Sequence, residues 1–426
     1  MNPNMNNPKS ILLIAPFCYP IWGPEANVNS KFIKTLTDGG YVVDLISAKC
    51  KVKTYPDSDS EFYVSGVREK ILVDSDPLSK FKLSKIKRKL YSLIVSSRIR
   101  TIVDLSVIEV RMIKVVDLLC KIHKYDYVIT KHRGDNAGFY CAKKYGVTLL
   151  YTFNDPWPRK KNPKPYGYGP TCPITWVEKQ ALKNIAKLSY KIIFPSTRLK
   201  DYVMQYLPQE AQNKGIIFPH TVTSALINSS KNQNTNPELH IMHTGSTGMC
   251  RDPEVLFKGL RLFLDKHNDA KFKIQFVGVE EMPLPGRSIK DYIQIFHLEN
   301  YIEEFPPVSY ETSIEYISKS DVCLILEANC EEGIFMPTKI TDYQQCGKPI
   351  WAISPAVGVL NDLYKTNDIE YFSEVTSAIS VRDAFEKIYN DYISSGGTLK
   401  RNDSTLFYDV NIIKEIHKCL DAPDIV

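Results

Sequence analysis

A segment in the second half of the chain combines residue types that suit phosphate binding at the start of a helix. Two acids and a glycine, residues 331–333, precede Pro337, a residue favoured in the first turn of a helix, and Gly347 ends the helical pattern. Lys339 and Asp342 lie three residues apart and therefore share one helix face. Because free amides at a helix N-terminus attract anions, the segment predicts a diphosphate site. The alternative is a capped helix that carries both side chains on its surface.

A second loop rich in glycine and hydroxyl residues lies earlier in the chain. Thr244, Gly245 and Ser246 follow an apolar strand pattern, and Arg251 comes shortly before an amphipathic helix that starts near Glu254. Such a loop offers backbone amides to an anion. A glycine loop alone is weak evidence, and a surface arginine before a helix is the ordinary alternative.

Three polar segments in the first half of the chain follow strand patterns. Gly23 lies in the first of them, which lacks GxGxxG and so disfavours a dinucleotide-dependent oxidoreductase. His132 follows the run 127–130, and Asp155 follows the run 148–152. Residues at the carboxyl edge of a parallel sheet commonly bind ligands, so either side chain could orient or deprotonate a substrate hydroxyl. A lone histidine is more often structural.

Strand and helix patterns alternate along the chain in two series, which predicts an α/β protein with two parallel sheets. The strand-like runs of the first series are 11–15, 41–47, 71–73, 127–130, 148–152 and 191–194. Those of the second series are 240–243, 272–277, 293–296, 322–326 and 350–353. A polar stretch between the series predicts a first domain at 1–219, a linker at 220–237 and a second domain at 238–426. The last helical pattern, 411–420, is expected to cap the second domain or to cross back to the first.

The acidic loop and the helix after it resemble a known signature. A Glu-Gly loop followed by Pro337, Lys339, Asp342 and Gly347 is similar to the donor-binding segment of glycosyltransferase family 4 and related GT-B enzymes. The loop that ends at Arg251 resembles the Gly-Ser...Arg-Asp-Pro segment of the same enzymes. This likeness implies a GT-B fold, in which two Rossmann-like domains face each other across a cleft. It also implies retaining transfer of a sugar from a nucleoside diphosphate sugar to an acceptor hydroxyl.

The resemblance implies roles for the residues of the acidic loop and of the helix after it. Glu332, next to Gly333, would contact the donor sugar, Lys339 the phosphates and Asp342 the ribose hydroxyls. The sequence departs from the family pattern at Ile340, where the usual second glutamate would stand. The Pro-x-Lys variant of the family has its acid at the later position, which matches Asp342.

The same likeness extends to the other loops. Gly245 and Ser246 would approach the donor diphosphate, and Arg251 would neutralise its charge as it departs. The first loop, at Gly23, resembles the glycine-containing loop of family 4 that approaches donor and acceptor. The Asp-Pro-Trp run at Asp155 is similar to that of a subset of the family.

Composition limits the class of protein. A length of 426 residues, 43% of them hydrophobic, suits two domains with substantial cores. The ten cysteines are scattered without a CxxC pair, which favours reduced thiols and a cytoplasmic location. A net charge of +6 is modest for a nucleic-acid-binding protein, and none is expected as a partner. No apolar run reaches the roughly 18 residues that cross a bilayer, so membrane contact would be peripheral.

Two further patterns concern metals and membranes. Asp-x-Asp tripeptides at 57–59 and 74–76 could hold a divalent metal, as in GT-A transferases, but that fold leaves the second series unexplained, and no metal or other cofactor is expected. Basic and apolar residues alternate at 80–100, and a basic loop spans 159–166. They suit an anionic membrane surface and a lipid-linked acceptor, as in bacterial-type surface polysaccharide or glycolipid assembly. A solvated helix face is the alternative.

Two other functions remain open. A non-catalytic subunit that binds nucleotide sugars would keep the fold without turnover. A sugar-nucleotide epimerase of similar two-domain form would interconvert donor sugars without an acceptor.

Overall fold

The computed structural model describes residues 8–19, 21, 23–49, 61–74, 106–131, 133–223, 238–247, 250–278 and 287–420. Five predictions lie wholly or partly outside these residues. They are the histidine at 132, the acidic tripeptides at 57–59 and 74–76, the basic stretch at 80–100 and the linker at 220–237.

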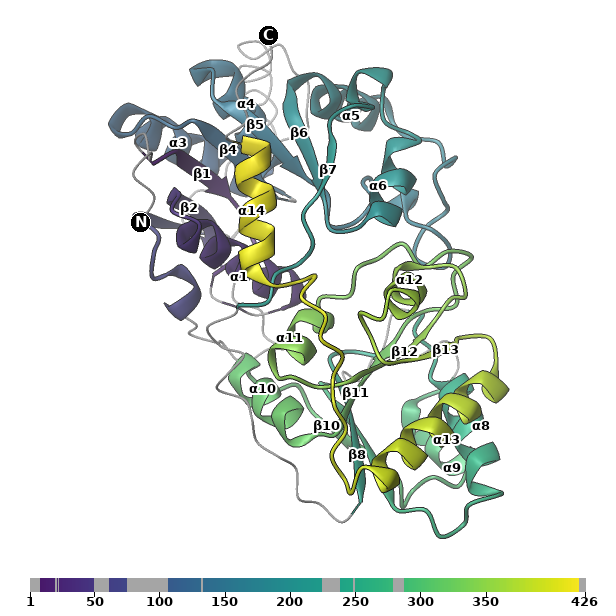
Figure 1. The fold of residues 1–426 in the computed structure, drawn as a ribbon. Coiled ribbons are helices and arrows are strands. Elements are labelled where there is room, and N and C mark those ends of the chain that lie inside the picture. Colours follow the sequence, from purple (N-terminus) through teal and green to yellow (C-terminus); the bar gives the residue numbers. More distant parts are fainter. Residues whose placement is uncertain are drawn as a thin grey trace.

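Seven parallel strands form the first sheet, in the order β3-β2-β1-β4-β5-β6-β7 (Figure 1). They are β1 (Ser10–Ile14), β2 (Val42–Lys49), β3 (Glu69–Asp74), β4 (Tyr127–Thr130), β5 (Thr148–Thr152), β6 (Ser189–Phe194) and β7 (Gly215–Ile217). The helices of this half are α1 (Pro24–Asp38), α3 (Val107–Ile122), α4 (Asp135–Tyr145), α5 (Trp176–Leu188) and α6 (Thr197–Met204). Along β1, Leu12 and Ile14 enter one core while Ile11 and Leu13 enter the other. Burial on both faces is typical of a parallel sheet covered by helices on each side.

Six parallel strands form the second sheet, in the order β10-β9-β8-β11-β12-β13. They are β8 (Leu239–Thr244), β9 (Phe272–Val277), β10 (Ile302–Phe305), β11 (Val322–Leu326), β12 (Ile350–Ser354) and β13 (Tyr371–Glu374). The helices are α8 (Glu254–Leu264), α9 (Ile289–Ile295), α10 (Tyr310–Lys319), α11 (Lys339–Gln345), α12 (Val359–Lys365) and α13 (Ala378–Ser394). Residues of α8, α9 and α13 pack in the core on one face, and residues of α10, α11 and α12 pack on the other. The prediction of two Rossmann-like domains with parallel sheets is confirmed.

One predicted strand of the second series is wrong. The run 293–296 belongs to the end of α9, which starts at a capping box between Ser288 and Asp291. The strand at this position in the sheet is β10, with Glu303 and Glu304 in its centre. An edge strand with a solvated side carries such acids, so its pattern was too polar to be predicted as a strand.

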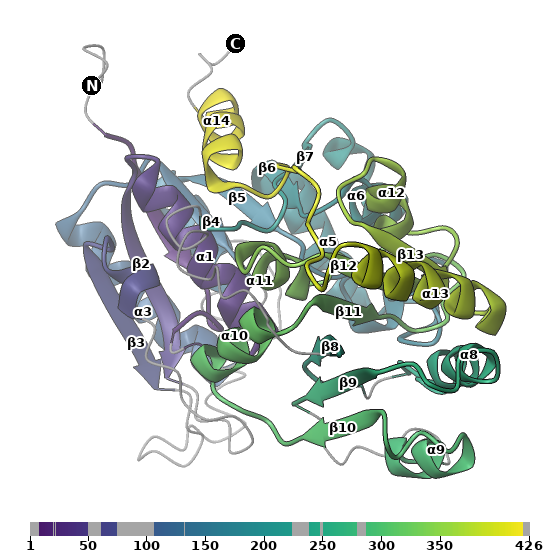
Figure 2. The ribbon, with the colours of Figure 1, turned by 60° about the horizontal axis from the view of Figure 1, so that its bottom comes forward.

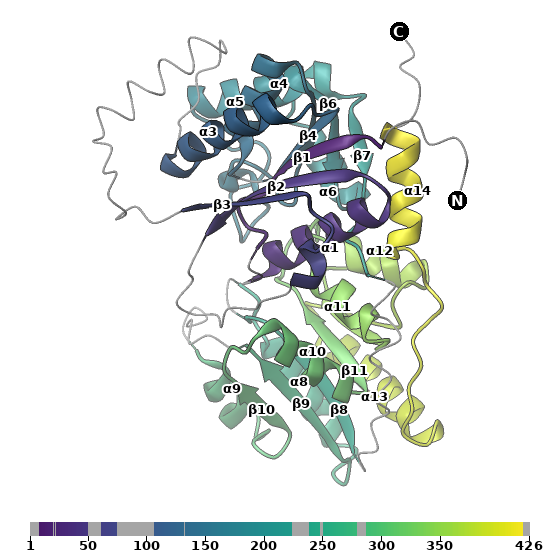
Figure 3. The ribbon, with the colours of Figure 1, turned by 90° about the vertical axis from the view of Figure 1, so that its left-hand side faces the viewer.

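The final helix, α14 (Asp409–Leu420), lies against the first domain. Ile412, Ile416 and Leu420 share a core with residues of β1 and α1. The His417 ring is hydrogen-bonded to the Gly39 carbonyl at 2.9 Å. Figure 3 shows α14 beside α1, far from the helix α13 that precedes it in the chain. The chain therefore returns to the first domain after completing the second.

The two domains meet along α1 and α11, which lie side by side between the sheets (Figures 2 and 3). Among the described residues, no helix is long and apolar enough to cross a membrane.

Candidate functional site

The glycine loop after β8 comes close to the start of α11. Gly245 has φ +92°, a left-handed conformation that favours glycine, and its amide donates to the Val277 carbonyl at 2.6 Å. A Cβ atom at Gly245 would lie 3.2 Å from Cε of Lys339. The two signatures found in the sequence therefore meet, and they do so at the carboxyl edge of the second sheet, where α/β proteins bind ligands.

Lys339 is held there by a buried histidine. Its Nζ lies 3.0 Å from Nε2 of His243, whose Nδ1 lies 3.0 Å from the Leu324 carbonyl oxygen. A carbonyl only accepts, so Nδ1 carries the proton and Nε2 accepts from Lys339. Burial, and then the charge of Lys339, holds the pKa of His243 well below its usual value. The neutral ring thus orients the lysine without adding a charge.

Positive charge is crowded at this point. Burial, followed by the nearby charge of Arg251, holds the pKa of Lys339 well below its usual value, and only Glu327 acts in the opposite direction. A site that disfavours a second cation in this way favours a bound anion, because the anion would offset both charges.

Glu327 is a site residue that sequence analysis missed. It follows β11, is 8% exposed, and accepts a hydrogen bond from Ser354. Burial raises the pKa of its carboxyl to about 7, although Ser354, Arg251 and Lys339 oppose the shift. Its position directly after a buried strand is the same signal that selected Asp155, and it was available in the sequence.

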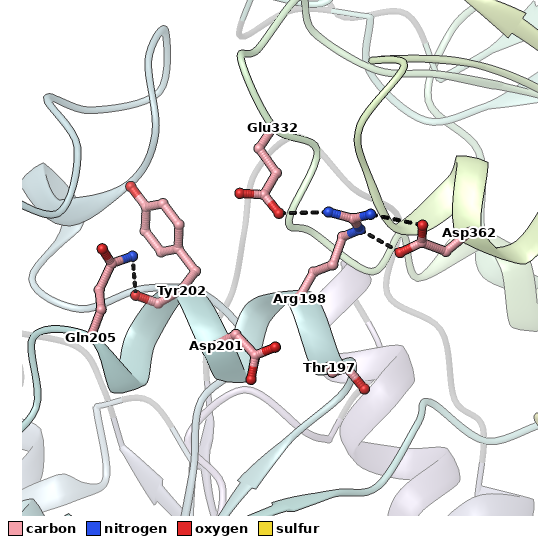
Figure 4. Close-up of a pocket in the computed structure, with 7 residues that line it drawn as sticks. All are labelled: Thr197, Arg198, Asp201, Tyr202, Gln205, Glu332 and Asp362. Atoms are coloured by element: carbon pink, nitrogen blue, oxygen red, sulfur yellow. Dashed lines mark hydrogen bonds and ion pairs between the residues drawn. The ribbon is translucent and has the colours of Figure 1, made fainter. Parts of the chain in front are cut away.

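Glu332 borders a cavity of about 510 Å³ between α6 and the second domain (Figure 4). Arg198 of α6 donates from Nη1 to Glu332 at 2.7 Å and from Nη2 to Asp362 at 2.8 Å, and its Nε donates to the second oxygen of Asp362. An arginine of the first domain thus binds two carboxylates of the second. Gly333, the next residue, pairs with Gly358, and a Cβ on it would lie 3.2 Å from Oε2 of Glu327. The cavity therefore adjoins the Lys339 site.

Asp342 lies in a separate cluster that joins the domains. Its carboxylate accepts hydrogen bonds from Asn27 Nδ2 at 2.9 Å, from Lys31 Nζ at 2.6 Å and from the Tyr310 hydroxyl at 2.8 Å. Asn27 and Lys31 belong to α1, and the Lys31 side chain is 0% exposed. Lys339 and Asp342 thus engage different partners despite their spacing. A ribose at Asp342 would have to replace at least one of these donors.

Two segments of the first domain approach the same region. Asp155 stays open to solvent, yet surrounding protein raises the pKa of its carboxyl by desolvation, while the charge of Arg251 lowers it. The Tyr166 ring packs edge-on against Phe335 of the second domain, with centroids 5.2 Å apart. Burial raises the pKa of the Tyr166 hydroxyl to about 12, again against the charge of Arg251. Arg251 therefore faces both domains.

The remaining predicted residues lie around this centre. Gly23 precedes α1 as its N-cap, in open space where a Cβ would meet nothing within 4 Å. Ser246 follows Gly245 in the glycine loop. Within the described residues, no group of three or more His, Cys, Asp or Glu side chains could hold a metal ion.

No protein-family model matches this sequence, and a comparison with curated proteins finds no match either. The fold does resemble solved structures. Sucrose-phosphate synthase from Thermosynechococcus elongatus is 15% identical, with a TM-score of 0.61 over 96% of this chain and 98% of that one. Anabaena HepE, solved in complex with UDP-glucose, is 13% identical, with a TM-score of 0.60 over 97% and 100%.

A third similar structure comes from another class of enzyme. It is a Listeria monocytogenes protein described as a UDP-N-acetylglucosamine 2-epimerase, 9% identical, with a TM-score of 0.55 over 98% of both chains. These likenesses show that the chain has the GT-B fold, with two Rossmann-like domains. Because transferases and an epimerase share this fold, the activity has to be argued from the site.

Proposed function

We propose that the chain is a glycosyltransferase that moves a sugar from a nucleoside diphosphate sugar to an acceptor hydroxyl. One observation carries the proposal: Lys339, whose pKa is depressed by burial and then by the charge of Arg251, lies with the glycine loop of Gly245 at one sheet edge. The largest physical demand of the reaction is to stabilise the departing diphosphate. Lys339 and Arg251 meet that demand, whereas the Gly245 amide is already bonded to the Val277 carbonyl.

The other residues fit around this diphosphate site. We propose that the transferred sugar occupies the cavity beside Glu332 and that Asp342 binds the ribose. The sugar would displace Arg198 from Glu332, and the ribose would replace a donor on Asp342. The acceptor would approach from the first domain, where Asp155 faces Arg251. Retention of anomeric configuration is what the sequence resemblance implies, and NMR of the product tests it.

We further propose that no metal takes part. Arg251 and Lys339 supply the positive charge that a divalent ion would supply elsewhere. Turnover should therefore survive EDTA, and loss of turnover that manganese restores would contradict this proposal.

The acceptor is proposed to be lipid-linked, at the cytoplasmic face of an anionic membrane and in surface polysaccharide or glycolipid assembly. Arg159, Lys160 and Lys161 form a basic 3₁₀ turn shortly after Asp155, on the acceptor side. Arg159 is exposed, whereas Lys160 pairs with Glu178 and Lys161 is buried, so Arg159 is the residue of this turn that can meet an anionic surface, with a contribution of about 1 kcal/mol. Binding to phosphatidylserine vesicles at low salt tests this part separately, and its failure would favour a soluble acceptor.

The decisive test of transfer uses Arg251→Ala with Arg261→Ala as the matched control. Arg261 lies on α8 and pairs with Asp265 one turn away, outside the site. The protein is screened with UDP- and GDP-sugars, and release of nucleoside diphosphate is measured. Arg251→Ala should lower turnover by about 100-fold or more, because one such contact contributes roughly 3 kcal/mol in the transition state. Equal turnover in both variants would remove Arg251 from the site.

The same screen separates the two other functions. An epimerase would convert one sugar nucleotide into another without releasing the nucleoside diphosphate. A non-catalytic subunit would be stabilised by a sugar nucleotide in thermal unfolding and leave it intact.

A further inference from the structure

Glu25 lies where three neighbouring strands end, in the part of the first domain that faces the donor site. It stands in the first turn of α1, directly after the loop that follows β1. Lys131 follows β4 and Asp155 follows β5. β1 pairs with β4 and β4 pairs with β5, so the three loops leave the same edge of the sheet side by side.

Two polar atoms in this region lack a hydrogen-bond partner among the described residues. One is Oε1 of Glu25 and the other is the hydroxyl oxygen of Thr152, a residue that is 5% exposed and ends β5. A buried polar atom without a partner costs about 1–3 kcal/mol. The Oε1 atom of Glu25 can therefore accept a hydrogen bond from a hydroxyl group outside the chain.

A small cavity of about 10 Å³ lies next to Thr152, and Glu25 does not line it. Its lining includes Val28 and Phe32, one and two turns after Glu25 on the same face of α1, together with Lys131 and Thr152. The volume suits about one water molecule. Nζ of Lys131 lies 4.5 Å from the centroid of the Phe32 ring, so the ammonium is held in the lining of this cavity. A water here would be a partner for the Thr152 hydroxyl.

The charged groups that face Glu25 lie in the loops after β4 and β5 and at the start of α4. Burial raises the pKa of its carboxyl to about 7, with Asp155 and Asp135 acting in the same direction and Lys131 and Arg133 opposing them. Burial lowers the pKa of Lys131 to about 8, and Glu25 opposes that shift. A group whose pKa lies near neutral pH suits proton transfer, because it is available as a base and still accepts a proton readily.

The thiol of Cys18, in the loop after β1, is a further titratable group near Glu25 among the described residues. Burial raises its pKa to about 12, so it stays neutral and adds no charge.

We propose that Glu25 binds the acceptor hydroxyl and accepts its proton, with Asp155 beside it and Lys131 as the opposite charge. This inference rests on the proposed function. The acceptor oxygen forms a bond to the anomeric carbon of the donor sugar on the face that the diphosphate leaves, as retention requires, and the bond from that carbon to the phosphate oxygen breaks. The electron pair of the broken bond leaves with the diphosphate, near Arg251, and the proton of the hydroxyl ends on Glu25. Glu25 becomes a catalytic residue that no sequence motif identified.

The test compares Glu25→Gln with Glu210→Gln, a matched change at an exposed position of the same domain. Nucleoside diphosphate release is measured from the sugar nucleotide that the wild type binds, first with water and then with alkyl glycosides as acceptors. Glu25→Gln should lower release at least 100-fold with either acceptor, as expected for loss of a general base. Its affinity for UDP, measured by calorimetry, should stay within twofold of the wild type, since Glu25 lies on the acceptor side.

The pH profile provides a readout that a merely structural role would not change. Only the carboxylate form of Glu25 accepts a proton, so turnover of the wild type should rise with pH through about 7. Lys131 lowers the pKa of Glu25, so Lys131→Gln should move this rise to higher pH. This variant keeps the proposal testable if Glu25→Gln does not fold.

The outcomes separate this assignment from the proposed function. A wild type that binds no sugar nucleotide refutes the proposed function. Normal UDP affinity in Glu25→Gln with turnover like that of Glu210→Gln refutes the role of Glu25 alone. Lost UDP affinity in Glu25→Gln, or an unshifted profile in Lys131→Gln, also refutes that role.

Discussion

At the scale of single residues, the proposed donor site contains charges that the protein alone does not balance. Lys339 donates to a neutral His243, and Arg251 lies near enough to depress the pKa of Lys339 further. Glu327, the acid that acts against this shift, has its own pKa raised by burial to about 7. A diphosphate would resolve the imbalance by stabilising the protonated lysine.

We therefore predict that UDP binding takes up protons. Lys339 has a depressed pKa in the free protein and a higher one beside the diphosphate, so between these two values binding adds a proton, and affinity falls as pH rises. Calorimetry in buffers of different ionisation enthalpy measures the uptake. Lys339→Met should abolish most of it and weaken binding by about 1.5–3 kcal/mol, the range for a hydrogen bond to a charged group.

Glu327→Gln is the comparison for this prediction. An anion also raises the pKa of Glu327, so some uptake above pH 7 belongs to that carboxyl. The Gln variant should lose this share and keep the share of Lys339. Proton release by the wild type, or uptake unchanged in Lys339→Met, would contradict the assignment of Lys339 to the phosphates.

The residues assigned to the proposed donor site can be picked out in the sequence, while their partners in the fold cannot. Gly245, Arg251 and Lys339 stand in local motifs, which can be recognised in a single sequence. His243 orients Lys339 from 96 positions away, and no periodic pattern records such a pairing. Glu25 and Glu327 were missed for another reason: each is a single acid next to an element boundary, and only burial makes its carboxyl unusual.

At the scale of elements, the first residue of α11, Lys339, belongs to the proposed donor site, and Asp342, one turn later, contacts the first domain. Lys339 points to His243, while Asp342 receives three donors from α1 and α10. Every residue from 340 to 345 is buried, because the short helix lies between the second sheet and α1. Sequence analysis predicted the helix and its end at Gly347, but expected a face shared by Lys339 and Asp342. The fold gives the two side chains different partners.

Asp342→Asn should strongly destabilise the protein. It would leave Lys31, which is 0% exposed, without its ion-pair partner, and breaking a buried pair in this way costs about 3–5 kcal/mol. The urea midpoint of the first unfolding transition measures the loss. Asp383→Asn, which breaks an exposed pair with Arg382, is the control and should cost less than about 1 kcal/mol. Equal midpoints in the two variants would show that the Lys31 pair does not stabilise the fold.

At the scale of the whole molecule, the domains are joined by two polar clusters and by the return of the chain through α14. The Lys31 cluster is buried, whereas Arg198, Glu332 and Asp362 line an open cavity and remain partly exposed. Sequence analysis predicted two α/β domains but not which side chains connect them, since Arg198 and Asp362 are 164 positions apart. Carboxylates expected to bind the donor, Glu332 and Asp342, are thus occupied by cations of the first domain. Donor binding and domain contact would compete for the same oxygen atoms.

Because Arg198 joins α6 to Glu332 and Asp362 of the second domain, we predict that the spacing of the domains depends on Arg198. Arg198→Gln removes both ion pairs of the exposed cluster, each of which contributes about 0.2–1 kcal/mol, while the buried Lys31 cluster stays intact. The domains should separate more often, and the radius of gyration from small-angle scattering should rise.

Salt should have a similar effect on the wild type, because screening weakens exposed pairs within a Debye length of about 8–10 Å, and should add little in the variant. Arg382→Gln, which breaks a pair within α13, should leave scattering and its salt dependence unchanged. If Arg198→Gln behaves like this control, the Arg198 cluster does not hold the domains together, and Glu332 is free to meet a donor without any change in their spacing.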